Sequence, residues 1–96
     1  MYNRTGHIEF DPEKARRNFL LHGIRFGDAE VALCDPMALT IEDPESSGEQ
    51  RLITLGVDSL GRVLLVVHTA RGDRTRIISA RKASRGETDR YYAKEL

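Results

Sequence analysis

The stretch RLITLGVDSLGRVLLVVHTARGDRTRIISARKASR, residues 51–85, decides the fold because it contains three candidate strands joined by two short turns. Residues 51–57 alternate in polarity, residues 63–67 are an unbroken run of valine and leucine, and residues 74–80 form the third candidate. Connections this short can join only antiparallel neighbours, because a parallel return needs a crossover of roughly a dozen residues. We therefore expect a three-stranded antiparallel meander whose central strand is buried on both faces.

Basic side chains are concentrated in the same stretch, which carries eight lysine and arginine residues against two acids, Asp58 and Asp73. Residues 27–50 hold seven acids and no lysine or arginine, and the formal net charge of the chain is zero. Neighbouring arginines repel unless something negative joins them, so the basic stretch can be a phosphate site. It can equally be a solvated sheet edge, and the segregated charges can match each other internally.

Length and composition fit one soluble domain over residues 1–96, with residues 1–6 as a candidate disordered end. The chain has 96 residues, of which 40% are hydrophobic and 31% charged. No apolar run approaches the ~20 residues needed to cross a membrane, and the start of the chain lacks the apolar core of a signal peptide. The single cysteine, Cys34, cannot form an internal disulfide. We therefore expect a cytoplasmic protein without membrane association.

Two helices are expected before the meander. Asp11 is a favoured N-cap, Pro12 fits the first helical position, and Gly23 is a natural end for this first helix. A second helix is expected from residue 28 to about residue 33, with Gly27 as its N-cap.

A third helix is expected after the meander, where Ser84 and Glu87 have the spacing of a capping box. Short strands are expected at residues 7–10 and 38–41, which are apolar and β-prone. Packing the helices on one face of the sheet predicts an α+β domain of two layers with an antiparallel sheet centred on the meander.

The residue types favour cleavage of a phosphodiester without a metal. No H-E-x-x-H or C-x-x-C motif occurs, so we expect no metal ion or other cofactor. Arginine and lysine can neutralise the charge of the transition state, while a carboxylate, histidine or lysine moves the proton of a 2′-hydroxyl. Such chemistry needs RNA as the substrate, because DNA lacks the internal nucleophile.

Four residues are candidates for catalysis. A period of two places Arg74, Arg76, Ile78 and Ala80 on one face of the third strand. We expect Arg76 and Arg81 to contact phosphate. His68, which follows the most buried strand, is either catalytic or a hydrogen-bonded core histidine, and Glu49 is a loop acid unless the fold brings it to the sheet. The candidate substrate-binding residues are Lys14, Arg51, Arg74 and Lys82.

Longer motifs resemble the BrnT family of small bacterial toxins from residue 10 to residue 92. The first is D-P-x-K-A-x-x-N followed by H-G in the first predicted helix. The others are V-V-H-T, which begins in the central strand and ends just after it, and R-I-I-S-A-R-K-A, which begins in the third strand and ends just after it. The chain departs from the family pattern at Glu45 and Ser46, where relatives often have histidine followed by serine.

The resemblance implies a RelE-like fold, in which two or three helices pack on an antiparallel sheet. It also implies a ribonuclease that stops translation and is held in check by a ribbon-helix-helix antitoxin of the BrnA kind. Operator DNA would be bound only through the toxin–antitoxin complex. We therefore expect a metal-independent endoribonuclease toxin. The alternative is a non-catalytic module that binds nucleic acid or the antitoxin and acts as a transcriptional co-repressor.

Overall fold

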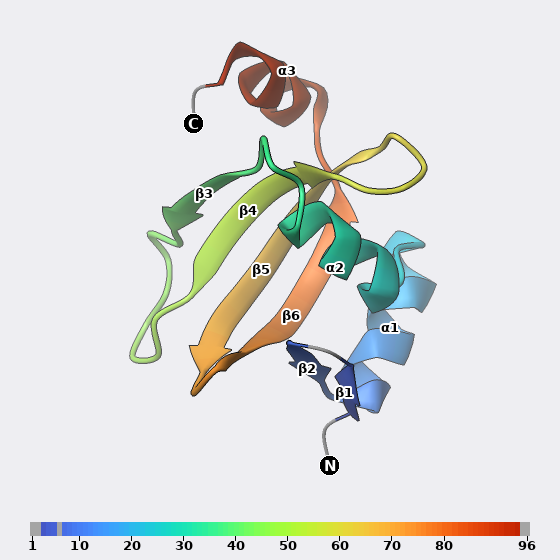
Figure 1. Cartoon of the computed structure of the whole chain (residues 1–96), viewed down its shortest axis with the longest axis vertical. Coiled ribbons are helices and arrows are strands. Elements are labelled where there is room, and N and C mark those ends of the chain that lie inside the picture. Colours follow the sequence, from blue (N-terminus) through green and yellow to red (C-terminus); the bar gives the residue numbers. More distant parts are fainter. Residues whose placement is uncertain (1–2, 6, 95–96) are drawn as a thin grey trace.

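The computed structural model describes residues 3–5 and 7–94. Figure 1 shows α2 lying across one face of a twisted sheet, α1 beside it, and α3 at the end of the sheet where β6 stops. The candidate disordered end overlaps β1, and residues 1, 2 and 6 lie outside the described residues. The elements are, in order, β1 (Asn3–Thr5), β2 (Ile8–Phe10), α1 (Pro12–His22), α2 (Phe26–Leu33), β3 (Leu39–Glu42), β4 (Leu52–Val57), β5 (Val63–Arg71), β6 (Arg74–Lys82) and α3 (Arg85–Ala93).

The sheet has six strands within the described part of the chain, in the order β1-β2-β6-β5-β4-β3. Consecutive strands β4, β5 and β6 pair antiparallel and form the meander, as their two short turns require. β2 runs parallel to β6, so the expectation of a purely antiparallel sheet was wrong. Most of the chain lies between β2 and β6, and no short turn therefore constrains the direction in which they pair.

Two apolar clusters lie on opposite faces of the sheet. The main cluster packs Leu64 and Val66 of β5 under α2, and both side chains are fully buried. The smaller cluster packs Val63 of β5 against Tyr91 of α3. Leu65 shares this second face and stays half-buried, because α3 covers only one end of the sheet. The predicted burial of β5 on both faces is therefore correct for the first face and too strong for the second.

Close packing of α2 on β4 depends on Gly56. A Cβ atom at this position would lie 2.1 Å from a backbone carbonyl oxygen of α2, so a larger residue would push the helix away. The helix begins at Phe26 with Arg25 as its N-cap, and not at residue 28 with Gly27 as the cap. Phe26 is buried, and its ring meets that of Phe10 edge-on with 5.6 Å between centroids. This tertiary contact stabilises a helix start that local capping preferences did not indicate.

The predicted ends of the other two helices are confirmed. Asp11 accepts a hydrogen bond from the backbone N–H of Glu13 at 3.0 Å, and Gly23 takes a left-handed conformation with φ of 72°. Ser84 and Glu87 form both hydrogen bonds of the capping box at the start of α3. Each of these caps satisfies backbone groups that the helix itself leaves unpaired.

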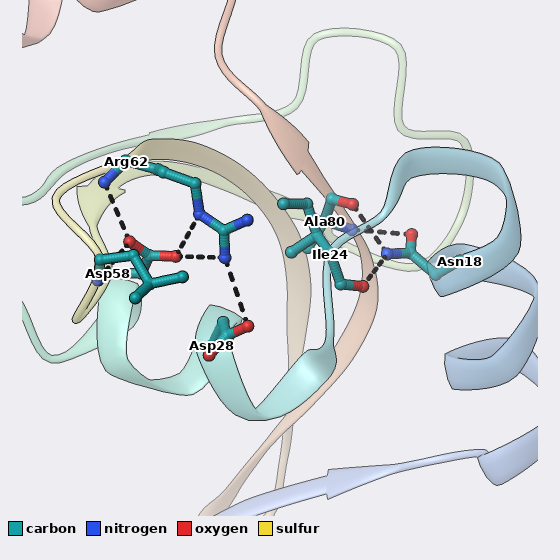
Figure 2. A network of polar contacts seen from close by, with 7 residues as sticks. Asn18, Ile24, Asp28, Asp58, Arg62 and Ala80 are labelled. Carbon is teal, nitrogen blue, oxygen red and sulfur yellow. Dashed lines mark hydrogen bonds and ion pairs between the residues drawn. The ribbon is translucent and has the colours of Figure 1, made fainter.

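Asn18 of α1 caps the part of β6 that β2 does not reach. In the described part of the chain, β2 pairs only with Thr75 and Arg76 of β6. The Asn18 amide donates to the carbonyl oxygens of Ala80 and Ile24, at 2.8 and 3.0 Å, and accepts from the Ala80 N–H at 3.0 Å (Figure 2). Since Asn18 is only 6% exposed, this side chain substitutes for both water and a neighbouring strand.

A second polar cluster ties the β4–β5 turn to α2. Asp58 is buried in this turn and accepts hydrogen bonds from the backbone of Leu60 and Arg62. The Arg62 guanidinium pairs with Asp58 at 2.6 Å and reaches Asp28 of α2 at 3.3 Å (Figure 2). Burial by itself would raise the pKa of Asp58, but the hydrogen bonds outweigh it and lower this pKa. Asp58 is therefore ionised at neutral pH and anchors the turn.

The Asn18→Leu variant should lower the free energy of unfolding by about 3 kcal/mol or more, because three buried backbone hydrogen bonds lose their partner. Urea denaturation of the purified protein measures this loss. The control is Arg17→Leu, which alters an exposed neighbour in the same helix and should change stability by about 0.5 kcal/mol or less. A loss below about 1 kcal/mol for Asn18→Leu would contradict the proposed edge cap.

Candidate functional site

A β-bulge places Arg76 and Arg81 on the same face of the sheet. Strict alternation would put them on opposite faces, because an odd number of positions separates them. The register of β5 and β6 shifts by one residue at Val67/His68. Arg81 lies opposite Leu65, and Arg76 lies opposite Thr69, so both point away from α1 and α2. We call this side of the sheet the arginine face.

Because of this bulge, the residues of β6 share faces differently from the prediction. Ile77 and Ala80 both belong to the main core under the helices, although a period of two places them on opposite faces. Ile78 has no partner on β5, which makes it the extra residue of the bulge. The predicted shared face is therefore correct for Arg74 and Arg76, and wrong for Ile78 and Ala80, which follow the bulge or form it.

Arg76 is held by Glu9, a residue that the sequence did not single out. The two residues are register partners across the parallel β2–β6 pair. Arg76 Nη2 lies 3.1 Å from Glu9 Oε2, and the Glu9 side chain is almost entirely buried. Glu9 alternates with Ile8 and Phe10, which indicates that it faces away from the core, but the sequence does not reveal its partner.

Glu49 is brought to the same end of the arginine face. Thr69 donates a hydrogen bond from Oγ1 to the carbonyl oxygen of Gln50 at 2.6 Å, which holds the loop against β5. Glu49 forms an ion pair with Arg71 at 2.8 Å. The hydrogen bond from Arg71 lowers the pKa of Glu49, and the charge of Arg76 contributes to the same shift. An ionised carboxylate therefore lies within electrostatic reach of Arg76, and Arg71 joins the site as a second residue that the sequence did not single out.

Arg81 has its own carboxylate partner at the other end of the arginine face. Its two Nη atoms donate to the two carboxylate oxygens of Glu87 in α3, at 2.9 and 3.0 Å. These hydrogen bonds lower the pKa of Glu87 to about 2 and raise the pKa of Arg81. Glu87 also accepts from the Ser84 N–H at 2.7 Å. The capping box was visible in the sequence, whereas the second role of Glu87 toward Arg81 was not.

His68 lies on the other face of the sheet, among the core residues. It is the register partner of Ile77, it is buried, and its Nε2 lies 2.8 Å from Thr54 Oγ1. The Thr54 hydroxyl in turn lies 2.7 Å from that of Thr40. Burial lowers the pKa of His68, so the imidazole is neutral at neutral pH. The structure does not bring His68 together with Arg76, and it matches the hydrogen-bonded core histidine that was the alternative.

The four candidate substrate-binding residues are dispersed. Arg74 is the register partner of Arg71 and lies next to the Glu49 end of the arginine face. Arg51 is exposed just before β4, Lys82 is exposed at the end of β6, and Lys14 is exposed on α1. Arg74 is thus adjacent to the site that Arg76 and Glu49 form, and Arg51 is close to it in sequence because it directly follows Gln50, the residue that Thr69 holds.

Across residues 3–5 and 7–94, histidine, cysteine and acidic side chains form no group of three or more that could hold a metal ion. The helices in this part of the chain are all too short or too polar to span a membrane.

The comparison with known families identifies the chain. A family model described as the ribonuclease toxin BrnT of type II toxin-antitoxin systems matches residues 10–87. The chain belongs to the BrnT family. This family makes the protein a ribonuclease toxin, with RNA as its target and an antitoxin as its partner.

The fold is also similar to a solved structure of the same kind, the crystal structure of the Brucella abortus ribonuclease toxin BrnT. The two chains are 25% identical with a TM-score of 0.62, over 79% of this chain and 94% of that chain. No curated protein sequence matches this BrnT-family chain.

The Glu87→Gln variant should lower the free energy of unfolding by about 1–2 kcal/mol at pH 7. This is less than the free energy that corresponds to the full pKa shift, because Arg81 is partly exposed and solvent weakens the pair. Because folding lowers the pKa of Glu87 from 4.5 to about 2, its contribution is complete above pH 4.5 and is lost as the pH falls toward 2. Urea denaturation at several pH values measures the difference from the wild type. The control Glu13→Gln removes an exposed ion pair and should cost about 0.5 kcal/mol at most. If the stability difference between the variant and the wild type were the same at pH 2.5 as at pH 7, the assigned pKa would be contradicted.

Proposed function

We propose that this BrnT-family protein cleaves RNA on the arginine face without a metal ion and thereby stops translation. Its proposed partner is a ribbon-helix-helix antitoxin of the BrnA kind, through which alone it meets operator DNA in the cytoplasm. The proposal treats residues 1–96 as one RelE-like domain. The observation that supports it most directly is the bulge in β6, because it puts both candidate arginines on one face, with an ionised carboxylate within electrostatic reach of Arg76.

The two arginines take different roles in this proposal. Their register partners, Leu65 and Thr69, are four residues apart on β5, which corresponds to about 13 Å along the strand. Glu49 lies within electrostatic reach of Arg76, so we assign Arg76 to the scissile phosphate. Arg81 lies one or two nucleotides further along and holds a neighbouring phosphate.

The reaction is an internal transfer to the 2′-oxygen. Glu49 accepts the proton of the 2′-hydroxyl and the 2′-oxygen attacks phosphorus. The bond from phosphorus to the 5′-oxygen breaks, and the 5′-oxygen takes up a proton from water. Arg76 neutralises the charge that develops on the non-bridging oxygens. The low pKa of Glu49 keeps this residue ionised at neutral pH, although it also makes the carboxylate a weak base. His68 does not contact RNA in this proposal and instead links β5 to Thr54.

The ion pairs of Arg76 and Arg81 favour a second candidate function as well. Both guanidinium groups already have carboxylate partners, so RNA must compete with Glu9 and Glu87 for them. A non-catalytic family member would bind nucleic acid or the antitoxin and act as a co-repressor. Its binding function would not require the arginines to leave their carboxylate partners in every catalytic cycle. Cleavage measurements separate the two functions.

RNA cleavage should persist in excess EDTA and leave a 2′,3′-cyclic phosphate or a 3′-phosphate, because a carboxylate and an arginine carry the proposed chemistry. Gel analysis of a labelled single-stranded RNA, with end-group assignment of the products, tests this. The matched 2′-deoxy strand should remain uncut. Loss of activity in EDTA that magnesium restores would rule out the metal-free mechanism.

Arg76→Ala should lower the cleavage rate at saturating RNA by about 10²–10³-fold, as expected when one donor to transition-state charge is removed. Arg76→Lys should rescue the rate poorly, because lysine lacks the planar two-pronged donor. Arg81→Ala should instead weaken binding of an uncleavable 2′-deoxy analogue and reduce its salt slope by about 0.7. The saturated rate of this second variant should change little.

The opposite pattern would contradict the assignment of the two arginines. A normal saturated rate in Arg76→Ala would make Arg76 a substrate holder. A large rate loss in Arg81→Ala with normal analogue binding would move the reaction to the other end of the arginine face. Circular dichroism and melting of each variant establish that the fold is intact.

A further inference from the structure

Three consecutive apolar side chains of α1 are exposed. Phe19, Leu20 and Leu21 have 41%, 71% and 77% of their surface accessible. Successive residues of a helix point about 100° apart, so a single sheet cannot bury all three. The described part of the chain covers none of them well, and grouped exposed apolar residues of this kind mark interaction sites.

Two grooves flank this helix. The first has a volume of about 380 Å³ and is lined mainly by aromatic side chains, Phe10, Phe19 and Phe26, with Arg16 and Arg25 at its rim. The second has a volume of about 220 Å³ and is lined by Lys14, Arg17, Asn18, Leu21, His22, Ile78 and Ser79. Leu20 lies on the ridge between the grooves, because it follows Arg16 and Arg17 by one helical turn.

The rims of the grooves carry more positive than negative charge. Lys14, Arg16, Arg17 and Arg25 are basic, whereas Glu13 is the acid among them, 2.9 Å from Arg16 and 3.9 Å from Arg17. These pairs are largely exposed and therefore weak, so incoming carboxylates can replace them. Arg25 also stacks over the Phe19 ring at 4.9 Å, which leaves its donors available at the groove edge.

We propose that α1 and its two grooves are the docking site for a segment of the antitoxin that carries large apolar side chains flanked by aspartate or glutamate. Apolar side chains would enter the grooves beside Leu20, and the carboxylates would meet the basic rim. The aliphatic Leu20, Leu21 and Ile78 favour a protein partner over RNA, because they offer neither hydrogen bonds nor stacking surfaces to a base. The proposal rests on the proposed function only in taking the partner to be the antitoxin.

This docking site is centred on α1 and the adjoining edge of β6, and Arg76 and Arg81 are not among the residues that line it. Asn18 of α1 packs against the backbone edge of β6 at Ala80, whereas Arg76 and Arg81 point to the face of the sheet that α1 and α2 leave open. Substitutions on α1 should therefore weaken antitoxin binding without slowing RNA cleavage by the free toxin. This separation makes failure of the docking site distinguishable from failure of the ribonuclease proposal.

The test measures the affinity of the purified full chain for the antitoxin encoded beside it, by calorimetry. Leu20→Glu and Leu21→Glu place a charge on the docking site and should each weaken binding tenfold or more. Arg17→Glu should weaken it as well, by reversing a rim charge. The matched control is Leu60→Glu in the β4–β5 turn, which alters an equally exposed leucine, 71% accessible, and should stay within twofold of wild type. All four variants should cleave RNA at the wild-type rate.

A footprint by amide hydrogen exchange adds a measurement that needs no variant. Antitoxin binding should slow exchange in residues 14–22 and 25–27, and leave the β4–β5 turn unchanged.

Equal affinities of the Leu20, Leu21 and Leu60 variants would overturn the docking site, as would a footprint confined to the arginine face. Loss of self-association in Leu21→Glu with unchanged antitoxin affinity would assign the surface to a second copy of the chain, and loss of RNA binding alone would assign it to nucleic acid. Absence of antitoxin binding by the wild type would overturn this site and the proposed partner together, while its RNA cleavage would be judged separately.

Discussion

The hydrogen bonds of Asn18 to the backbone of Ala80 and Ile24 fix how the helical layer meets the sheet. Within the described residues β2 pairs with β6 at two positions, and beyond them the edge of β6 would otherwise present unpaired amides to α1. A side-chain amide has a donor and an acceptor side by side, so it can pair with both groups of one strand residue. The third bond, to the carbonyl oxygen of Ile24, fixes the position of the segment that leads into α2. The positions of α1, α2 and both grooves beside α1 follow from this contact.

The bulge of β6 determines which side chains lie on the arginine face. One extra residue, Ile78, reverses the alternation between Ile77 and Ser79. The core retains Ile77 and Ala80, while Arg76 and Arg81 both emerge on the face that α1 and α2 leave open. Without the bulge, burying Ala80 would place Arg76 in the core beneath the helices, where an unpaired charge would cost several kcal/mol.

The charges of the arginine face bear on how a chain of zero net charge could offer the proposed phosphate site. Arg76, Arg81 and Arg71 are accompanied by Glu9, Glu87 and Glu49, respectively. The partners hold each guanidinium in place before substrate arrives, which reduces the entropy lost on binding. They also reduce the positive potential that would attract RNA from a distance. We therefore expect affinity for RNA to depend on local exchange of partners more than on long-range attraction.

Local physical chemistry let the sequence alone determine much of this protein. The meander followed from two turns too short for a parallel return, and the ends of α1 and α3 followed from their capping residues. The motifs also sufficed to indicate the family. The tertiary structure decided the parallel pairing of β2 with β6, the bulge, and hence the face of Arg76. It also decided the partners Glu9, Arg71 and Glu87 and the placement of His68 in the core. These features depend on contacts between residues far apart in the chain, and neither periodicity nor spacing within one segment contains that information.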